Sequence, residues 1–77
     1  MVIGVDTHKR SHTLVALDAA TGTARGQLTI PATDDGTLEA LRFAGELDDQ
    51  RVWAVEDCRH VSGRLERGLV ASGDRVI

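Results

Sequence analysis

The segment 2–9 constrains the fold of this 77-residue chain more than any other stretch. It begins with the apolar run Val2-Ile3-Gly4-Val5, which leads directly into Asp6 and then into a polar, basic segment. Apolar runs without alternation are typical of strands buried on both faces at the centre of an α/β sheet. Such sheets usually carry functional groups at the carboxyl ends of their strands. The sequence therefore predicts a central strand with Asp6 at its functional end.

The rest of the chain alternates between strand and helix patterns, which predicts the order β-β-β-α-β-α-β. Gly22 fits a turn between the second and third strands. The third strand is predicted to be an edge strand with one solvent-exposed face, and Pro31 ends it. A helical crossover then allows the fourth strand to lie parallel to the first. The fold class is therefore α/β: a three-stranded antiparallel meander followed by α-β-α-β. The predicted strands cover about 2–6, 12–18, 24–30, 51–56 and 74–77, and the predicted helices cover about 34–47 and 60–72.

The spacing of apolar residues also predicts which side of each helix faces the core. Thr33 or Asp34 is expected to cap the first helix, and Trp53 is expected to be a core residue of the fourth strand. The predicted inward residues of the first helix are Leu38, Leu41, Ala44 and Leu47, with Phe43 beside them. In the second helix the predicted inward residues are Val61, Leu65, Leu69 and Val70, and the outward ones are Arg59, Arg64 and Arg67.

Length and composition limit the chain to one small domain at most. The single cysteine, Cys58, has no partner for a disulfide, which fits a reducing compartment. No window is long and apolar enough to span a bilayer, so we expect no membrane association and a cytoplasmic protein. The chain stops at residues 75–77, which look like the start of a strand, and we expect it to be the N-terminal part of a longer protein. An incomplete sheet would expose an edge and apolar surface, which favours a homo-oligomer.

The net charge of −3 argues against a strong non-specific nucleic-acid binder. The only aromatic residues are Phe43 and Trp53, too few for a platform on which single-stranded bases stack. Any contact with nucleic acid is therefore expected at a catalytic site.

Two carboxylates, Asp6 and Glu56, each end an apolar strand. On neighbouring parallel strands their backbones would lie roughly 4.8 Å apart, so both side chains can bind one divalent cation. Mg²⁺ or Mn²⁺ suits such oxygen ligands and supports phosphodiester chemistry. Asp57 is an alternative to Glu56, because strand register decides which of the two faces the site. A plain helix cap or a solvated loop residue is the alternative for each carboxylate.

Several segments of the chain form a pattern of order and spacing. They are Gly4-Val5-Asp6-Thr7-His8-Lys9, the strand ending at Leu17-Asp18, Gly36, Leu38, Leu41, Val52-Trp53-Ala54-Val55-Glu56, Leu65 and Gly73-Asp74-Arg75-Val76-Ile77. This pattern resembles a family, the DEDD insertion-sequence transposases of the "one-ten" group. The resemblance spans essentially the whole chain and depends on order and spacing more than on any single motif.

This resemblance implies a RuvC-like version of the ribonuclease-H-like fold, with metal-dependent cleavage and exchange of DNA strands. It implies that Asp6 and Glu56 are catalytic metal ligands, and that two later aspartates lie beyond Ile77. DNA is the implied partner, together with a guide RNA. The family also has a nucleophilic serine in a C-terminal domain, and no serine of this chain matches its context. The 77 residues hold half of the acidic site and are therefore expected to be inactive alone.

The segment 8–12, His-Lys-Arg-Ser-His, is the only basic cluster near Asp6. Lys9 and Arg10 are candidates for contacts with a phosphate backbone, and a solvated turn is the alternative. A zinc site from His8, Cys58 and His60 is disfavoured, because the ligand spacing is wrong and no second cysteine is present.

Two other function classes compete with a transposase. An actin-like or sugar-kinase ATP-binding half also opens with a strand, an Asp and a phosphate-binding hairpin, but the segment 7–11 lacks the expected glycine. The absence of a glycine-rich segment at Glu56 disfavours this class further. The second alternative is a catalytically silent interaction module.

Overall fold

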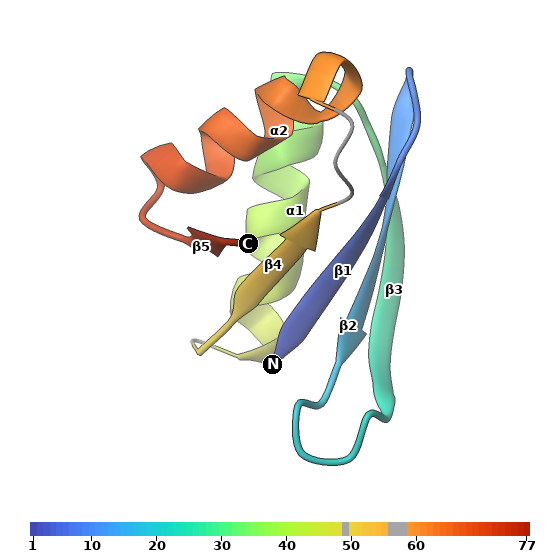
Figure 1. Cartoon of the computed structure of the whole chain (residues 1–77), viewed down its shortest axis with the longest axis vertical. Coiled ribbons are helices and arrows are strands. Elements are labelled where there is room, and N and C mark those ends of the chain that lie inside the picture. Colours follow the sequence, from blue (N-terminus) through green and yellow to red (C-terminus); the bar gives the residue numbers. More distant parts are fainter. Residues whose placement is uncertain (49, 56–58) are drawn as a thin grey trace.

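A computed structural model describes residues 1–48, 50–55 and 59–77, with the side chains of 59–61 left out. It contains one five-stranded sheet and two helices, in the predicted order (Figure 1). The strands are β1 (Val2–Thr7), β2 (Ser11–Leu17), β3 (Ala24–Pro31), β4 (Val52–Val55) and β5 (Arg75–Val76), and the helices are α1 (Asp34–Leu47) and α2 (Arg59–Ala71). Neither helix, over the residues described, is long and apolar enough to cross a membrane.

The sheet has the strand order β3-β2-β1-β4-β5. The first three strands pair antiparallel, while β4 is parallel to β1 and β5 is parallel to β4. The pairing of β1 with β4 runs from Val2 opposite Val52 to Val5 opposite Val55. The predicted meander, the predicted edge position of β3 and the predicted parallel pairing of β4 with β1 are confirmed.

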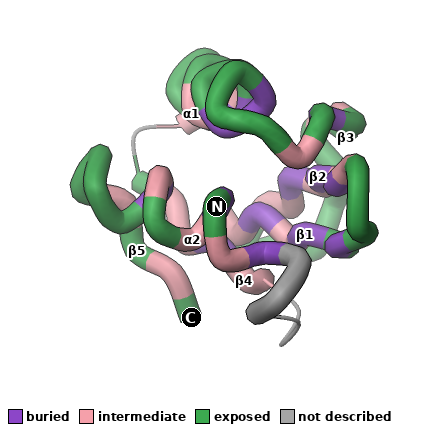
Figure 2. Tube along the Cα trace, turned by 90° about the horizontal axis from the view of Figure 1, so that it is seen from above, coloured by how far each residue is buried: buried purple, intermediate pink, exposed green. Residues whose placement is uncertain are grey.

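Both helices cover the same face of the sheet (Figures 1 and 2). The crossovers β3-α1-β4 and β4-α2-β5 advance in the same direction along the strand order, and right-handed crossovers of this kind bring their helices to one side. Among the described residues, the buried apolar side chains accordingly form one cluster between the sheet and the two helices. It comprises Ile3, Val5, Leu14, Ala16, Ile30 and Trp53 of the sheet, Ala40 and Ala44 of α1, and Leu65 and Leu69 of α2.

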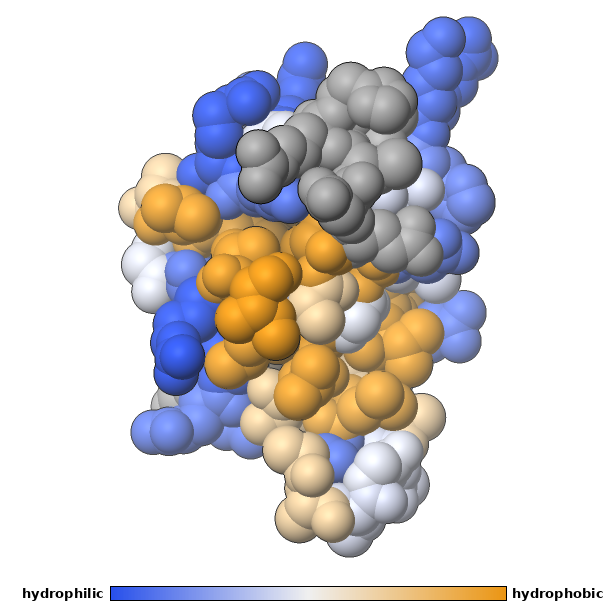
Figure 3. Space-filling model, in the orientation of Figure 1, coloured by the Kyte–Doolittle hydropathy of each residue, from blue (hydrophilic) through white to orange (hydrophobic). Residues whose placement is uncertain are grey.

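The opposite face, which we call the open face, is not covered by any described element. Along β1, Ile3, Val5 and Thr7 are buried, whereas Gly4 is half-buried and Asp6 is exposed. The prediction that this strand is buried on both faces was therefore wrong, because both helices lie on one side. The open face is nevertheless apolar over β1, β2 and β4 (Figure 3). Its half-buried residues include Val2, Gly4, Val15, Leu17, Val52 and Ala54.

Helix α1 begins where Thr33 accepts a hydrogen bond from the Gly36 backbone N–H at 3.1 Å, which confirms one of the two predicted caps. The helix packs through small residues, since Gly36, Thr37, Ala40 and Ala44 are its buried positions. A Cβ at Gly36 would clash with the Pro31 carbonyl oxygen, so only glycine permits this approach. The prediction for Leu38 was wrong: it is 58% exposed, because the small residues occupy the contact face.

Helix α2 shows the same effect. Leu65 and Leu69 are buried as predicted, but Val70 is 62% exposed and that prediction was wrong. Gly68 lies against Thr37 of α1, so closely that an added Cβ would be 2.6 Å from the Thr37 methyl carbon. This contact between small groups sets the rotation of α2 about its axis and turns Val70 outward. Arg64 and Arg67 are exposed as predicted, and the predicted inward Val61 and outward Arg59 lie outside the described side chains.

A buried ion pair joins Arg51, just before β4, to Asp74, just before β5. The Arg51 guanidinium donates to both carboxylate oxygens of Asp74, from Nε at 2.8 Å and from Nη2 at 3.2 Å. Trp53 Nε1 donates to Asp74 Oδ2 at 2.7 Å. The side chains of Arg51 and Asp74 are only 16% and 9% exposed. This triad anchors the edge of the sheet, and it satisfies the indole N–H of the buried Trp53 as the core requires.

Candidate functional site

Asp6 lies at the carboxyl end of β1, on the open face of the sheet. It pairs with Thr13 of β2, and its side chain is 60% exposed to solvent. Because side chains alternate along a strand, the buried Val5 and Thr7 on either side of Asp6 point into the core and fix the strand beneath it. The predicted position of Asp6, at the carboxyl end of a central strand, is confirmed.

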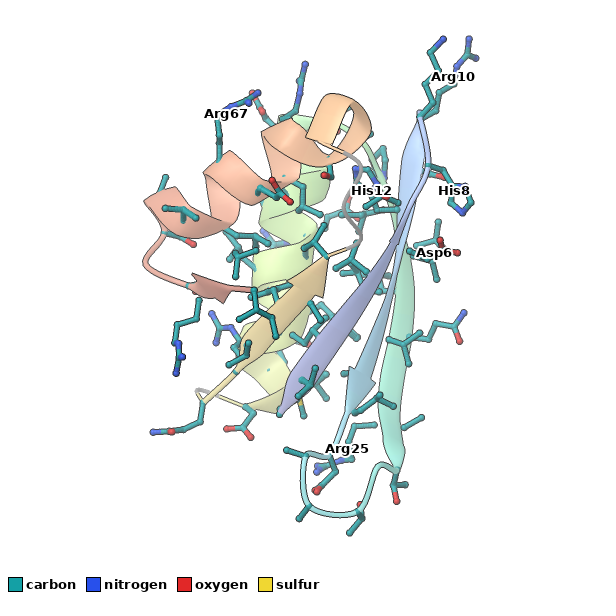
Figure 4. All side chains as sticks on the ribbon, in the orientation of Figure 1. Asp6, His8, Arg10, His12, Arg25 and Arg67 are labelled. Atoms are coloured by element: carbon teal, nitrogen blue, oxygen red, sulfur yellow. The ribbon has the colours of Figure 1, made fainter. Side chains whose placement is uncertain are left out.

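His8 is the side chain that contacts Asp6. The two residues are separated by two positions, so the alternation of β1 brings them to the same side as the strand ends (Figure 4). His8 Nε2 lies 3.2 Å from Asp6 Oδ2, within hydrogen-bonding distance. Both side chains are 60% exposed, and among the described residues the second carboxylate oxygen of Asp6, Oδ1, has no hydrogen-bond partner. Sequence reasoning assigned no role to this contact, although the separation of two residues at the strand end could have suggested it.

The second predicted metal ligand, Glu56, lies outside the described residues, as do its alternative Asp57 and the free Cys58. The described pairing of β1 with β4 ends at Val5 opposite Val55, one residue before each carboxylate. Within residues 1–48, 50–55 and 62–77, whose side chains are described, no three His, Cys, Asp or Glu side chains gather as a metal site would require. The shared site of Asp6 and Glu56 therefore stays a prediction.

Lys9 and Arg10 occupy the turn between β1 and β2. The turn is held by a hydrogen bond from His8 N to Ser11 O at 3.0 Å, and Ala32 N donates to Arg10 O at 2.9 Å. Both basic side chains are exposed, and Arg10 extends away from the body of the molecule (Figure 4). Neither forms an ion pair with another described residue. Among the described residues, these two cations of the turn after β1 therefore have no acidic partner.

His12, the last residue of the basic cluster, does not belong to this exposed surface. It lies in β2 opposite Thr7, only 2% exposed, on the face that the helices cover. Burial and, to a smaller extent, the nearby His8 lower the pKa of His12. Among the described residues, His12 Nδ1 and Thr7 Oγ1 have no hydrogen-bond partner. The alternation of β2 is the signal that separates this buried histidine from its exposed neighbours.

A pocket of about 430 Å³ lies at the other end of the sheet, where β4 and β5 begin. Its acidic side chain, Asp74, is already bound by Arg51 and Trp53. The carboxylate in this pocket is therefore already paired, unlike that of the exposed Asp6. Its lining residues are Met1, Gln50, Arg51, Val52, Gly73, Asp74 and Arg75.

A scan against protein-family models and a search of curated proteins found no match to this chain.

Proposed function

We propose that this chain provides the N-terminal part of a RuvC-like catalytic domain of a DEDD insertion-sequence transposase. In this proposal Asp6 and Glu56 hold Mg²⁺ or Mn²⁺ for cleavage and exchange of DNA strands. One observation carries it: Asp6 lies exposed at the carboxyl end of β1, which is the central strand between antiparallel β2 and parallel β4.

The architecture of the sheet supports the ribonuclease-H-like part of the proposal. That fold requires an antiparallel meander, then a helical crossover that brings the fourth strand beside the first. The strand order β3-β2-β1-β4-β5 and the directions of its strands agree with this requirement. Carboxylates that follow β1 and β4 are then neighbours at one edge of the sheet.

The register of β1 with β4 favours Glu56 over Asp57 as the second ligand. Trp53 lies opposite Ile3 and is buried on the helix-covered face, so the even-numbered residues of β4 share the open face with Asp6. In this proposal Glu56, which is even-numbered like Asp6, is therefore the second ligand in preference to Asp57. At the usual spacing of about 4.8 Å between strands, one cation can bridge Asp6 and Glu56.

The chemistry of Asp6 fits a hard divalent cation. One of its oxygens, Oδ2, meets His8, and the side chain is exposed enough for Oδ1 to bind a hydrated ion. When bound, the cation would supply charge stabilisation and an activated water for phosphodiester cleavage. The role of Asp6 is to hold that ion at a fixed point of a rigid central strand. Lys9 and Arg10, exposed on the adjacent turn, would contact the phosphate backbone and orient the DNA strand.

The apolar open face favours a second candidate, the silent interaction module. Val2, Val15 and Val52 lie half-buried on a surface that no described element covers. An ATP-binding hairpin has less support, because the turn has no glycine and its His8 N–H already donates to Ser11 O.

Paramagnetic broadening by Mn²⁺ in ¹H–¹⁵N spectra of the chain separates the transposase proposal from the interaction module. We expect added Mn²⁺ to broaden the amide signals of residues 5–8 first, and Asp6→Asn to abolish this local effect. Asp35→Asn is the matched control, since it removes an exposed carboxylate from the first turn of α1. Broadening that centres on Asp34 and Asp35, or that survives in Asp6→Asn, would contradict the proposed metal site.

A further inference from the structure

The contact between His8 and Asp6 goes one step beyond the proposed function and rests on it. We propose that His8 is a positioning residue: its Nε2–H donates to Asp6 Oδ2 and so directs Oδ1 toward the divalent cation. The observed separation of 3.2 Å between His8 Nε2 and Asp6 Oδ2 carries this inference.

The backbone on both sides of the pair is fixed, which makes the contact a property of the fold. Thr7, between the two residues, is buried and belongs to β1. The His8 N–H donates to Ser11 O at 3.0 Å, which holds His8 at the first position of the turn. The imidazole therefore starts from a rigid point on the same side of the strand as the Asp6 carboxylate.

The Asp6 side chain needs such a partner. A carboxylate that is 60% exposed can sample several rotamers, and each must be restricted when a metal binds. A hydrogen bond to one oxygen reduces this freedom and leaves the other oxygen as the metal ligand. Carboxylates that bind metals are commonly oriented in this way by outer-shell residues, and loss of such a residue typically costs about 10–100-fold in metal affinity.

Direct coordination by His8 is the competing arrangement, and the chemistry of the ion disfavours it. Mg²⁺ selects oxygen ligands and keeps several of its waters. An imidazole beside such an ion serves better as a donor to the carboxylate than as a ligand.

The test measures the affinity of the chain for Mn²⁺ by electron paramagnetic resonance in wild type and four variants. We expect His8→Ala to bind Mn²⁺ about 10-fold or more weakly. His8→Gln should recover most of the affinity, because the glutamine amide can donate from a similar position. Gln27→Ala, an exposed residue of β3, should leave the affinity unchanged, and Asp6→Asn should abolish it. The midpoint of thermal unfolding should be the same in His8→Ala and wild type.

The outcomes separate this inference from the proposed function. Unchanged affinity in His8→Ala, with binding lost in Asp6→Asn, would overturn the role of His8 alone. Binding retained in Asp6→Asn, or absent from wild type, would overturn the metal site and His8's role with it. Nitrogen couplings from an imidazole in the echo-modulation spectrum of bound Mn²⁺ would show direct coordination, which also contradicts a positioning role.

Discussion

The acidic residues at the two ends of the sheet lie in opposite environments. At the amino ends of β4 and β5, Asp74 is 9% exposed and both of its oxygens accept hydrogen bonds from Arg51 or Trp53. At the carboxyl end of β1, Asp6 is 60% exposed, and among the described residues His8 is its one side-chain partner, through Oδ2. A fully paired, buried carboxylate can do little besides hold the fold together. An exposed carboxylate with a free oxygen costs the fold little and is available for binding.

The largest effect on stability is expected at Asp74, at the amino ends of β4 and β5. Asp74→Ala removes the partner of a buried guanidinium and of a buried indole N–H, so we expect a loss of about 3–5 kcal/mol in the free energy of unfolding. Urea denaturation followed by circular dichroism measures it. Asp34→Ala is the control, because Asp34 is 88% exposed and lies 3.7 Å from Arg64, and should cost under about 1 kcal/mol. Equal effects of the two variants would contradict the contrast between paired and exposed carboxylates.

A smaller effect is expected from the buried His12, which lies in β2 opposite Thr7. Burial lowers its pKa in the folded state below the unfolded value of about 6.5. The unfolded chain therefore binds a proton more readily, so stability is complete above about pH 6.5 and falls as the pH drops below it. The limiting slope is about 1.4 kcal/mol per pH unit. Free energies of unfolding, measured by urea denaturation at several pH values from 7.5 to 5.5, give this slope.

His12→Leu should remove that pH dependence. The variant eliminates a desolvated nitrogen, Nδ1, that has no partner among the described residues, so we expect little or no loss of stability at pH 7. A pH dependence that persists in His12→Leu would assign it to other titrating groups. A large loss of stability at pH 7 would show that His12 supports the fold as Asp74 does.

The smallest effect on stability is expected for Asp6→Asn. Its side chain is exposed and makes one hydrogen bond, so the free energy of unfolding should change by no more than about 0.5 kcal/mol. Urea denaturation beside Asp74→Ala gives the direct comparison. A loss as large as that of Asp74→Ala would make Asp6 a structural residue and remove the basis of the contrast.

Local patterns were enough to predict the elements and the position of Asp6. The apolar run before Asp6, the alternation of β3 and the cap at Thr33 are all signals between near neighbours in sequence. The faces of the helices were predicted less well. Leu38 and Val70 are large apolar residues, yet both are exposed. Close contact between small residues decides which side of each helix is buried.

Contacts between residues far apart in the sequence account for part of what the sequence did not predict. Asp74 is 23 residues from Arg51 and 21 from Trp53, so nothing local predicts the ion pair that locks β4 to β5. His8 and Asp6 are only two residues apart, and the contact could have been predicted from the alternation of the strand.

The most direct test of the central claim is the anomalous difference map of crystals grown with Mn²⁺. The proposed metal centre predicts a peak within about 2.2 Å of an Asp6 carboxylate oxygen, on the open face of the sheet, with the Glu56 carboxylate on the same ion. A peak at another acidic cluster, or an Asp6 that binds no ion while Mn²⁺ occupies other sites, would contradict the account.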